Sequence, residues 1–275
     1  ADAKYQQSIV DAISRPAERV LTWASYQDIF LNERRVQAGA DFIKAHQSTF
    51  QRAEAEYGVP TEVVAAIIGV ETLYGRITGK YRVIDSLSTL AFDYPPRSKF
   101  FRSELKQFLL LAREEQQSPL KPLGSYAGAM GYGQFISSSY RHYAVDFDGD
   151  GVRDIWNNPV DAIGSVANYL AEHGWQRGGG ITVPVTLAGA EPTDVFNVSL
   201  LPNRMASDLS TLGVLVEPPL KGDEEVSPMR LEGKSGAEYW LGLKNFYVIT
   251  RYNHSKLYAM AVFQLSERIK AAQAS

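Results

Sequence analysis

The chain has 275 residues, of which 45% are hydrophobic and 21% are charged, and this composition is typical of a globular protein with one large domain or two close lobes. Its formal net charge of −3 argues against a protein that binds nucleic acid or an anionic membrane through bulk charge. There is no cysteine, which excludes a thiol nucleophile, a cysteine-ligated metal and disulfide bonds.

Helical patterns dominate the first two thirds of the chain. Residues 1–57 are predicted to be helical, with a stop at Gly58. A buried helix is expected over 61–75 and a short one over about 86–92. A long amphipathic helix is predicted to follow, with Ser98 as its N-cap.

The pattern changes after a Gly-rich loop at 122–135 and a further helix at 158–174. Residues 181–250 carry β-branched residues in short runs separated by Pro, Gly and Asp, which predicts four or five short strands. A helix closes the chain, and its apolar side should pack back on the first lobe. That side consists of Leu257, Met260, Ala261, Phe263 and Leu265.

An acidic loop at 146–157, DFDGDGVRDIWN, has the ligand spacing of an EF-hand calcium site. Asp146, Asp148 and Asp150 occupy positions 1, 3 and 5, and Gly151 at position 6 allows a sharp turn. Val152 at position 7 would supply a backbone oxygen. The alternative is a solvated Asp-Gly turn, but three close carboxylates repel one another without a cation, so calcium is favoured.

The closing ligand of this loop is ambiguous. Position 12 should be a bidentate Glu, but it is Asn157, whose neutral amide is a poor substitute. Asp161 could close the site if the loop is slightly longer than usual. Both residues therefore remain candidates.

Glu71 is the candidate catalytic residue. It lies four residues after Ile67 and seven after Val64, so helical spacing puts it on the core-facing stripe. Such a carboxylate is more often a structural group with a hydrogen-bond or ion-pair partner. However, Gly69 and Gly75 would let backbone or ligand approach closely, and the apolar neighbours favour the protonated form that a general acid needs.

No second carboxylate has a spacing that guarantees a partner for Glu71. Asp85 and Asp93 are possible, but we expect them to cap helices or form local salt bridges. A single acid departs from ordinary glycoside hydrolysis, which uses two carboxylates.

Aromatic and amide side chains form a third group, in GYGQF at 131–135 and ITRYNHSKLY at 249–258. Sugars are bound by such residues, because ring faces stack on aromatics and hydroxyls bond to amides. The histidines at 142, 173 and 254 lack metal-ligand spacing, and no P-loop, GxSxG or GxGxxG site is present.

Several long blocks in the same order closely resemble the lytic murein transglycosylase B family. The resemblance covers about residues 20–268 and is weakest in the β-rich segment and at the N-terminus. The blocks include IIGVETLYGRITGKYRVIDSLSTLAFDYP, GSYAGAMGYGQF, SSYRHYAVDFDGDG, NPVDAIGSVANYLAEHGW and NFYVITRYNHSKLYAMAV.

This resemblance implies a mainly α (α+β) fold with a lysozyme-like helical core, an extra helical lobe and a small β-rich insertion. The expected divisions are a helical lobe at 1–57 with part of 85–120, a core at 58–178 containing the EF-hand-like loop 146–161, an insertion at 179–245, and a C-terminal strand and helix at 246–275.

The family implies cleavage of the β-1,4 bond between N-acetylmuramic acid (MurNAc) and N-acetylglucosamine (GlcNAc) in peptidoglycan, with formation of 1,6-anhydromuramic acid. Glu71 matches the single acid/base, and the C6 hydroxyl of the substrate acts as internal nucleophile, so no second carboxylate is required. The alternatives are a lysozyme-type muramidase, which is a hydrolase, and a non-catalytic, calcium-stabilised peptidoglycan-binding protein.

By the same matching, Ser125 should bond near Glu71 or the substrate N-acetyl group, and Arg97 should contact the peptide stem. Tyr26 matches a helical-lobe tyrosine over the groove. The resemblance also implies a structural calcium ion with Asp161 as its last ligand. The remaining residues expected to line the cleft are Tyr132, Gln134, Tyr252, Asn253 and Tyr258.

Two departures from the family pattern are visible. Ile136 and Ser137 follow GQF where Met-Pro is common, and the calcium loop has one extra residue before Asp161. The chain lacks the N-terminal Cys of lipid-anchored members, so we expect a soluble periplasmic form, mature and without a signal peptide. Its expected partners are peptidoglycan strands and cell-wall synthesis enzymes, with no nucleic acid, no membrane-spanning segment and no organic cofactor.

Overall fold

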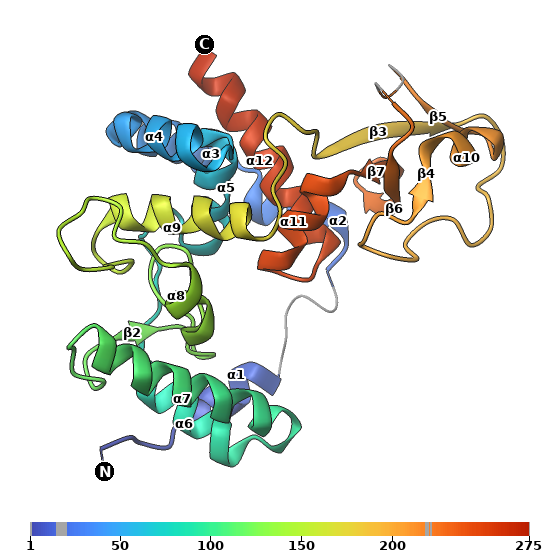
Figure 1. The fold of residues 1–275 in the computed structure, drawn as a ribbon. Helices are drawn as coiled ribbons and strands as arrows, with labels where there is room; N and C mark the ends of the chain where they lie inside the picture. The colour runs from blue at the N-terminus through green and yellow to red at the C-terminus, as the bar shows by residue number, and fades with distance from the viewer. Residues whose placement is uncertain (1, 15–20, 218–219, 221, 275) are drawn as a thin grey trace.

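Helix α5 (Thr61–Thr72) lies at the centre of the fold, and its residues 63–69 are all buried. The computed structural model describes residues 2–14, 21–217, 220 and 222–274. Helices α3, α4, α9 and α12 pack around α5. In Figure 1 a lobe containing α6 and α7 lies below this core, and a five-stranded sheet projects to its right.

The N-terminal segment contains four helices that do not pack as one unit. Helix α1 lies against α6, whereas α2, α3 and α4 pack on α12, α5 and α9 (Figure 1). The predicted lobe at 1–57 is therefore divided between two parts of the molecule, because each amphipathic helix buries its apolar side against a different partner. The helices are α1 (Gln7–Ser14), α2 (Trp23–Phe30), α3 (Glu33–Ala45) and α4 (Gln47–Tyr57).

Asp85 fixes the start of the chain to α6. Its carboxylate pairs with Arg82 at 2.8 Å and accepts the backbone N–H of Lys4, also at 2.8 Å. Asp85 is 2% exposed, and these bonds hold its pKa below the usual value although burial opposes them. The expectation that Asp85 forms a local salt bridge is confirmed. Its carboxylate has a structural role, because it holds the N-terminal segment on α6.

Helices α6 (Val83–Asp93) and α7 (Ser98–Glu114) are separated by a 3-10 turn at Pro95–Arg97. Helix α6 begins three residues before the predicted range. The prediction that Ser98 is an N-cap is wrong, because its backbone is already helical, with φ −52° and ψ −44°. Its hydroxyl instead donates to the Ala91 carbonyl at 2.6 Å, and so satisfies a carbonyl in the last turn of α6.

The Gly-rich segment links this lobe to the core. Strands β1 (Tyr81–Arg82) and β2 (Leu123–Gly124) form a two-stranded antiparallel sheet. Helices α8 (Ser137–Tyr143) and α9 (Pro159–Glu172) follow, and Gly174, with φ +88°, lies just beyond the end of α9 as predicted.

The β-rich segment forms an antiparallel sheet in the order β4-β6-β7-β3-β5, which confirms the expected four or five strands. A short helix, α10 (Ala206–Thr211), packs on it, and the sheet has its own small core that includes Val185, Val214 and Leu241. The strands are β3 (Thr182–Leu187), β4 (Arg204–Met205), β5 (Val214–Val216), β6 (Glu225–Gly233) and β7 (Gly236–Gly242).

Two helices, α11 (Lys244–Tyr252) and α12 (Lys256–Ala274), close the chain. The predicted C-terminal strand is wrong, because its residues form α11. Val248, Ile249 and Thr250 suggest a strand by propensity, but all three are buried in the helix, so tertiary packing overrides β propensity. Helix α12 packs on α5, α3 and α2 as expected for its apolar side. Among the described residues, no helix combines the length and apolar character needed to cross a membrane.

Helices α3 and α5 pack on each other, and each has a glycine that faces the Tyr74 side chain. A Cβ on Gly39 or Gly69 would lie 2.5 Å from the hydroxyl oxygen of Tyr74. This hydroxyl donates to the Arg35 carbonyl at 2.9 Å, and the Arg35 guanidinium bonds to the Gly69 carbonyl at 2.6 Å. Tyr74 therefore fills the space that the two glycines leave.

We predict that Gly69→Ala lowers the free energy of unfolding by about 1–3 kcal/mol, because the added methyl group displaces a buried tyrosine. Urea unfolding measures this loss. Gly189→Ala is the control, since a Cβ there meets nothing within 4 Å. An equal loss in both variants would contradict the tight contact between Gly69 and Tyr74.

Candidate active site

Glu71 lies in the last turn of α5, is half-buried, and is followed by a sharp change of direction. Leu73, Tyr74 and Gly75 have φ values of 51°, 59° and 81°, so three successive residues are left-handed. Only glycine adopts this conformation without cost, so the turn is strained at Leu73 and Tyr74. The predicted helix at 61–75 thus ends three residues early, and the turn leaves Glu71 at the helix terminus.

Thr72 fastens this turn to the loop at 131–135. Its hydroxyl accepts the Gly75 N–H at 3.0 Å and donates to the Tyr132 carbonyl at 2.8 Å. A Cβ on Gly75 would lie 2.1 Å from the Tyr132 ring. The space at Gly69 and Gly75 is therefore occupied by tyrosine rings, whereas the sequence suggested room for backbone or ligand.

Tyr258, on α12, donates its phenol proton to Glu71 Oε1 at 2.7 Å. Tyr258 is 2% exposed. Burial raises its pKa well above the usual value, and the charge of Glu71 raises it further. Tyr258 is therefore a neutral hydrogen-bond donor that holds one carboxylate oxygen in place.

Tyr252, on α11, stacks on Tyr258 with ring centroids 6.4 Å apart and planes 9° from parallel. Its hydroxyl donates to the Gly133 carbonyl at 2.6 Å, which ties α11 to the loop at 131–135. Burial raises the pKa of Tyr252 well above its usual value, and the charge of Glu71 contributes. The two tyrosines thus join Glu71 to the loop that contains Gln134.

Gln134 stabilises its own loop. Its backbone is left-handed, with φ 50°, and its side-chain amide nitrogen donates to the Thr78 carbonyl at 3.1 Å and the Gly131 carbonyl at 2.9 Å. The side chain therefore links the turn after α5 to the loop at 131–135.

Ser125 lies in the turn that precedes this loop. Its hydroxyl oxygen accepts the N–H groups of Ala127 at 3.2 Å and Ala129 at 3.1 Å. Its carbonyl accepts the Ser86 hydroxyl at 3.1 Å, which connects the turn to α6. The hydroxyl proton of Ser125 can be donated while both of these acceptor bonds are kept.

The other predicted site residues lie in different settings. Tyr26 is 2% exposed, with its ring 4.7 Å from that of Phe30, so little of it could contact a glycan. Asn253 is half-buried in the extended link between α11 and α12. Arg97 is exposed in the 3-10 turn of the α6–α7 lobe, 4.4 Å from the Phe100 ring centre.

Sequence reasoning missed Tyr169, on α9. Its ring packs on Tyr252 at 4.7 Å and on Phe135 at 5.7 Å, and its hydroxyl donates to the Arg251 carbonyl at 2.7 Å. Burial raises the pKa of Tyr169 to about 12. Helix α9 reads as an ordinary amphipathic helix, so no local signal marked this residue as support for the site.

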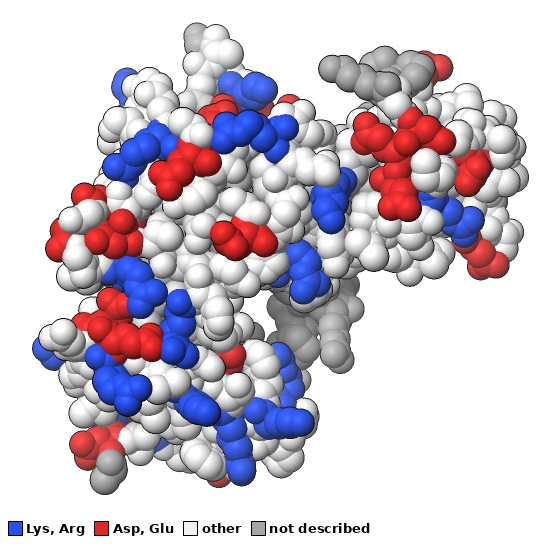
Figure 2. Space-filling view, viewed as in Figure 1, with Lys and Arg blue, Asp and Glu red and all other residues white. Residues whose placement is uncertain are grey.

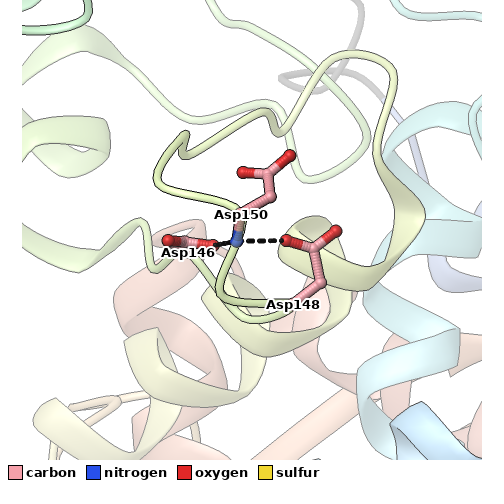
Figure 3. Close-up of side chains that lie close together, drawn as sticks. All are labelled: Asp146, Asp148 and Asp150. Carbon is pink, nitrogen blue, oxygen red and sulfur yellow. Dashed lines mark hydrogen bonds between the residues drawn. The ribbon is translucent and has the colours of Figure 1, made fainter.

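The acidic loop brings its three aspartates together (Figure 3). Asp146, Asp148 and Asp150 each offer a carboxylate oxygen within 4.8 Å of the others. The Asp150 N–H bonds to Asp146 Oδ1 and Asp148 Oδ1, both at 3.1 Å, and Gly151 turns with φ 90°. Three clustered carboxylate oxygens are suitable ligands for a hard cation such as calcium.

The two proposed closing ligands bond to other parts of the loop, and Asp161 is not among the clustered carboxylates. Asp161 is fully buried, and its two oxygens accept the N–H groups of Phe147 at 2.7 Å and Asp154 at 2.8 Å. Burial raises the pKa of Asp161, although these bonds oppose the shift. The backbone and amide N–H groups of Asn157 donate to Asp154. Asp161 is therefore a buried acceptor that holds the loop backbone, whereas Asp148 and Asp150 are exposed and Asp146 is half-buried.

Comparison with known proteins gives consistent matches over the whole chain. A family model described as the transglycosylase SLT domain matches residues 1–267. Membrane-bound lytic murein transglycosylase B from Escherichia coli (strain K12) is 45% identical over 267 residues, which are 97% of this chain and 73% of that protein.

Solved structures agree with this match. Soluble lytic transglycosylase SltB1 from Pseudomonas aeruginosa has a TM-score of 0.95 and 52% identity, covering 100% of this chain and 91% of that one. E. coli Slt35 in complex with calcium has a TM-score of 0.91 and 43% identity, covering 100% and 86%. P. aeruginosa SltB3 in complex with NAG-anhNAM-pentapeptide has a TM-score of 0.83 and 33% identity, covering 98% and 72%. The expected mainly α fold with a lysozyme-like core is confirmed.

We predict that Asp161→Asn lowers the free energy of unfolding by about 1–3 kcal/mol, since the new amide group sets a donor against a backbone donor. The loss should be the same in excess calcium and in chelator, because Asp161 bonds to backbone N–H groups. Thermal unfolding under both conditions measures it. A loss confined to calcium would instead make Asp161 a metal ligand.

Proposed function

The chain belongs to the transglycosylase SLT domain family and is a lytic murein transglycosylase, and we propose that one carboxylic acid, Glu71, carries its chemistry. The observation that supports this assignment is the 2.7 Å bond from Tyr258 to Glu71 Oε1. Tyr258 donates to Oε1, and we assign the transferred proton to the other oxygen, Oε2.

In the first step, Glu71 acts as a general acid. Oε2 gives its proton to the glycosidic oxygen between MurNAc and GlcNAc, the C1–O bond breaks, and positive charge develops at C1. The N-acetyl group of the substrate stabilises this charge. The carboxylate left on Glu71 is stabilised by the Tyr258 hydroxyl, whose raised pKa keeps its own proton in place.

In the second step, the Glu71 carboxylate acts as a general base. It takes the proton from the C6 hydroxyl of MurNAc, and O6 attacks C1 to form the 1,6-anhydro ring. The acid is regenerated, so protons balance without water. Because nucleophile and electrophile belong to one sugar, the reaction is intramolecular and needs no second carboxylate. Asp85, a candidate second carboxylate, is paired with Arg82.

A relative supports the formation of an anhydro sugar. SltB3 is solved with a ligand that contains an anhydro sugar, the ring that the second step forms.

The α6–α7 lobe has a positively charged surface. Four of its basic residues are exposed, and Lys and Arg side chains gather over this lobe at the lower right of Figure 2. These four are Arg97, Lys99, Arg102 and Lys106. We propose that Arg97 uses this positive surface to contact carboxylates of the peptide stem.

The remaining assignments complete the proposal. Ser125 and Asn253 orient the N-acetyl sugar, Gln134 and Tyr132 line the cleft, and Tyr26 and Tyr252 shape the setting of Tyr258. The substrate is the peptidoglycan glycan strand, the compartment is the periplasm, and cell-wall synthesis enzymes are partners.

We predict that Glu71→Gln lowers the rate on purified sacculi by about 10²–10⁴-fold, because the amide cannot transfer the proton. Mass spectrometry of the products should show muramic ends one water lighter than reducing ends for the parent protein. The control is Glu62→Gln, in the first turn of the same helix. Reducing ends alone would indicate a muramidase, and equal rates for Glu71→Gln and the parent would indicate a non-catalytic binding protein.

We also propose that Asp146, Asp148 and Asp150 bind calcium, with the Val152 carbonyl as a further donor. The carboxylate cluster supports this site, as does the calcium complex of Slt35. The ion neutralises three close charges and so stabilises the loop, while the reaction proceeds at Glu71 without it.

We predict that calcium at a hundredfold excess over its Kd adds about 2.7 kcal/mol to the free energy of unfolding. Asp148→Asn combined with Asp150→Asn should abolish this gain, whereas Asp208→Asn, an exposed aspartate on α10, should keep it. Thermal unfolding with calcium or chelator measures the effect. Loss of activity in chelator without a lower unfolding temperature would contradict a purely structural ion.

A further inference from the structure

The β6–β7 hairpin reaches from the sheet to α2, far from it in sequence. The Trp23 indole N–H, on α2, donates to Glu238 Oε2 at 3.2 Å, and Lys234 in the hairpin turn forms an ion pair with Asp28. Trp23 and Glu238 are separated by 215 positions. Since Trp23 is 1% exposed, the loss of this acceptor would leave a buried donor unsatisfied.

Glu238 Oε2 accepts a second indole. The Trp240 N–H, on β7, lies 3.4 Å from the same oxygen. The other oxygen, Oε1, covers Gly233, where an added Cβ would lie only 2.0 Å away. The carboxylate is therefore held between two indoles and a glycine that leaves room for it.

Trp23 connects the Glu238 carboxylate to the candidate active site. Its ring stacks on Tyr26, with centroids 6.5 Å apart and planes at 29°. Helix α2, which carries Tyr26, in turn packs on α12, which carries Tyr258. Helix α2 thus places an aromatic side chain beside the donor to Glu71.

Trp240 connects the Glu238 carboxylate to α12. Its ring packs edge-on against Phe263, with centroids 6.3 Å apart, and Phe263 follows Tyr258 by five residues on that helix. The Lys256 ammonium, at the start of α12, donates to the Arg230 carbonyl of β6 at 3.2 Å. One hairpin therefore contacts α2, which carries Tyr26, and α12, which carries Tyr258.

We propose that Glu238 is a positioning residue for the catalytic acid: it fixes α2 and α12 relative to each other, so that Tyr258 stays within hydrogen-bond distance of Glu71. This inference rests on the proposed role of Glu71. In this proposal the β-rich segment influences catalysis through its packing against α2 and α12, without contacting the reacting sugar.

The Glu238 carboxylate suits a positioning role because its Oε2 atom accepts hydrogen bonds from two indole N–H groups. A methionine at 238 has similar size but accepts only weakly, so both indoles would lose their acceptor. A glutamine keeps a carbonyl oxygen that can accept the same N–H groups. Comparing Glu238→Met with Glu238→Gln therefore separates the effect of the lost hydrogen-bond acceptor from the effect of side-chain size.

The test compares kcat and KM on soluble glycan strands, well below the unfolding temperature. Glu238→Met should lower kcat by about tenfold with KM within twofold, because misplacement of a catalytic group affects mainly the chemical step. Glu238→Gln should restore most of the rate. Glu232→Met, at an exposed position on the same hairpin, should match the parent.

Gly233→Ala is a second, independent variant, because its methyl group displaces the Glu238 carboxylate without removing it. It should lower kcat in the same way, and it decides the matter if Glu238→Met does not fold. Parental kcat in a folded Glu238→Met or Gly233→Ala would overturn the proposal, even if stability fell. Glu71→Gln is run alongside: parental activity there refutes the role of Glu71 itself, a result distinct from failure of Glu238.

Discussion

The structure depends on one hydrogen bond between a half-buried carboxylic acid and a buried phenol, from Tyr258 to Glu71. In the proposed mechanism this acid binds and releases a proton in each turnover, so its charged form needs a fixed donor in its half-buried setting. Tyr258 meets this need, because burial keeps its proton in place. The bond also joins α5 to α12, so the packing of two helices determines the geometry of the acid.

The elements around this bond restrict its movement. Three left-handed residues end α5 directly after Glu71 and Thr72, and the Thr72 hydroxyl binds the turn to the loop at 131–135. Tyr252 connects the same loop to α11. Glycines near the acid accommodate tyrosine rings. The strain at Leu73 and Tyr74 is consistent with a site whose surroundings impose an unfavourable backbone conformation.

Two peripheral parts of the molecule support the core in different ways. The acidic loop collects three carboxylates on its outer side, while Asp161 organises its backbone from the buried side. The sheet has its own small core, yet its β6–β7 hairpin contacts α2 through Trp23 and Glu238. A segment that adds no residue to the reacting centre can still influence it, because close-packed elements transmit small displacements.

The sequence by itself determined what depends on near neighbours: most of the helices, the stops at Gly58 and Gly174, the strand-rich segment, the spacing of the acidic loop, and Glu71 on the apolar side of its helix. The tertiary structure decided what depends on distant residues. Tyr258 meets Glu71 across 187 positions, α1 packs on α6, α11 is a helix despite its β-branched residues, and Asp161 bonds to backbone N–H groups. Local periodicity shows which side of an element is apolar, but it does not specify which other element covers that side.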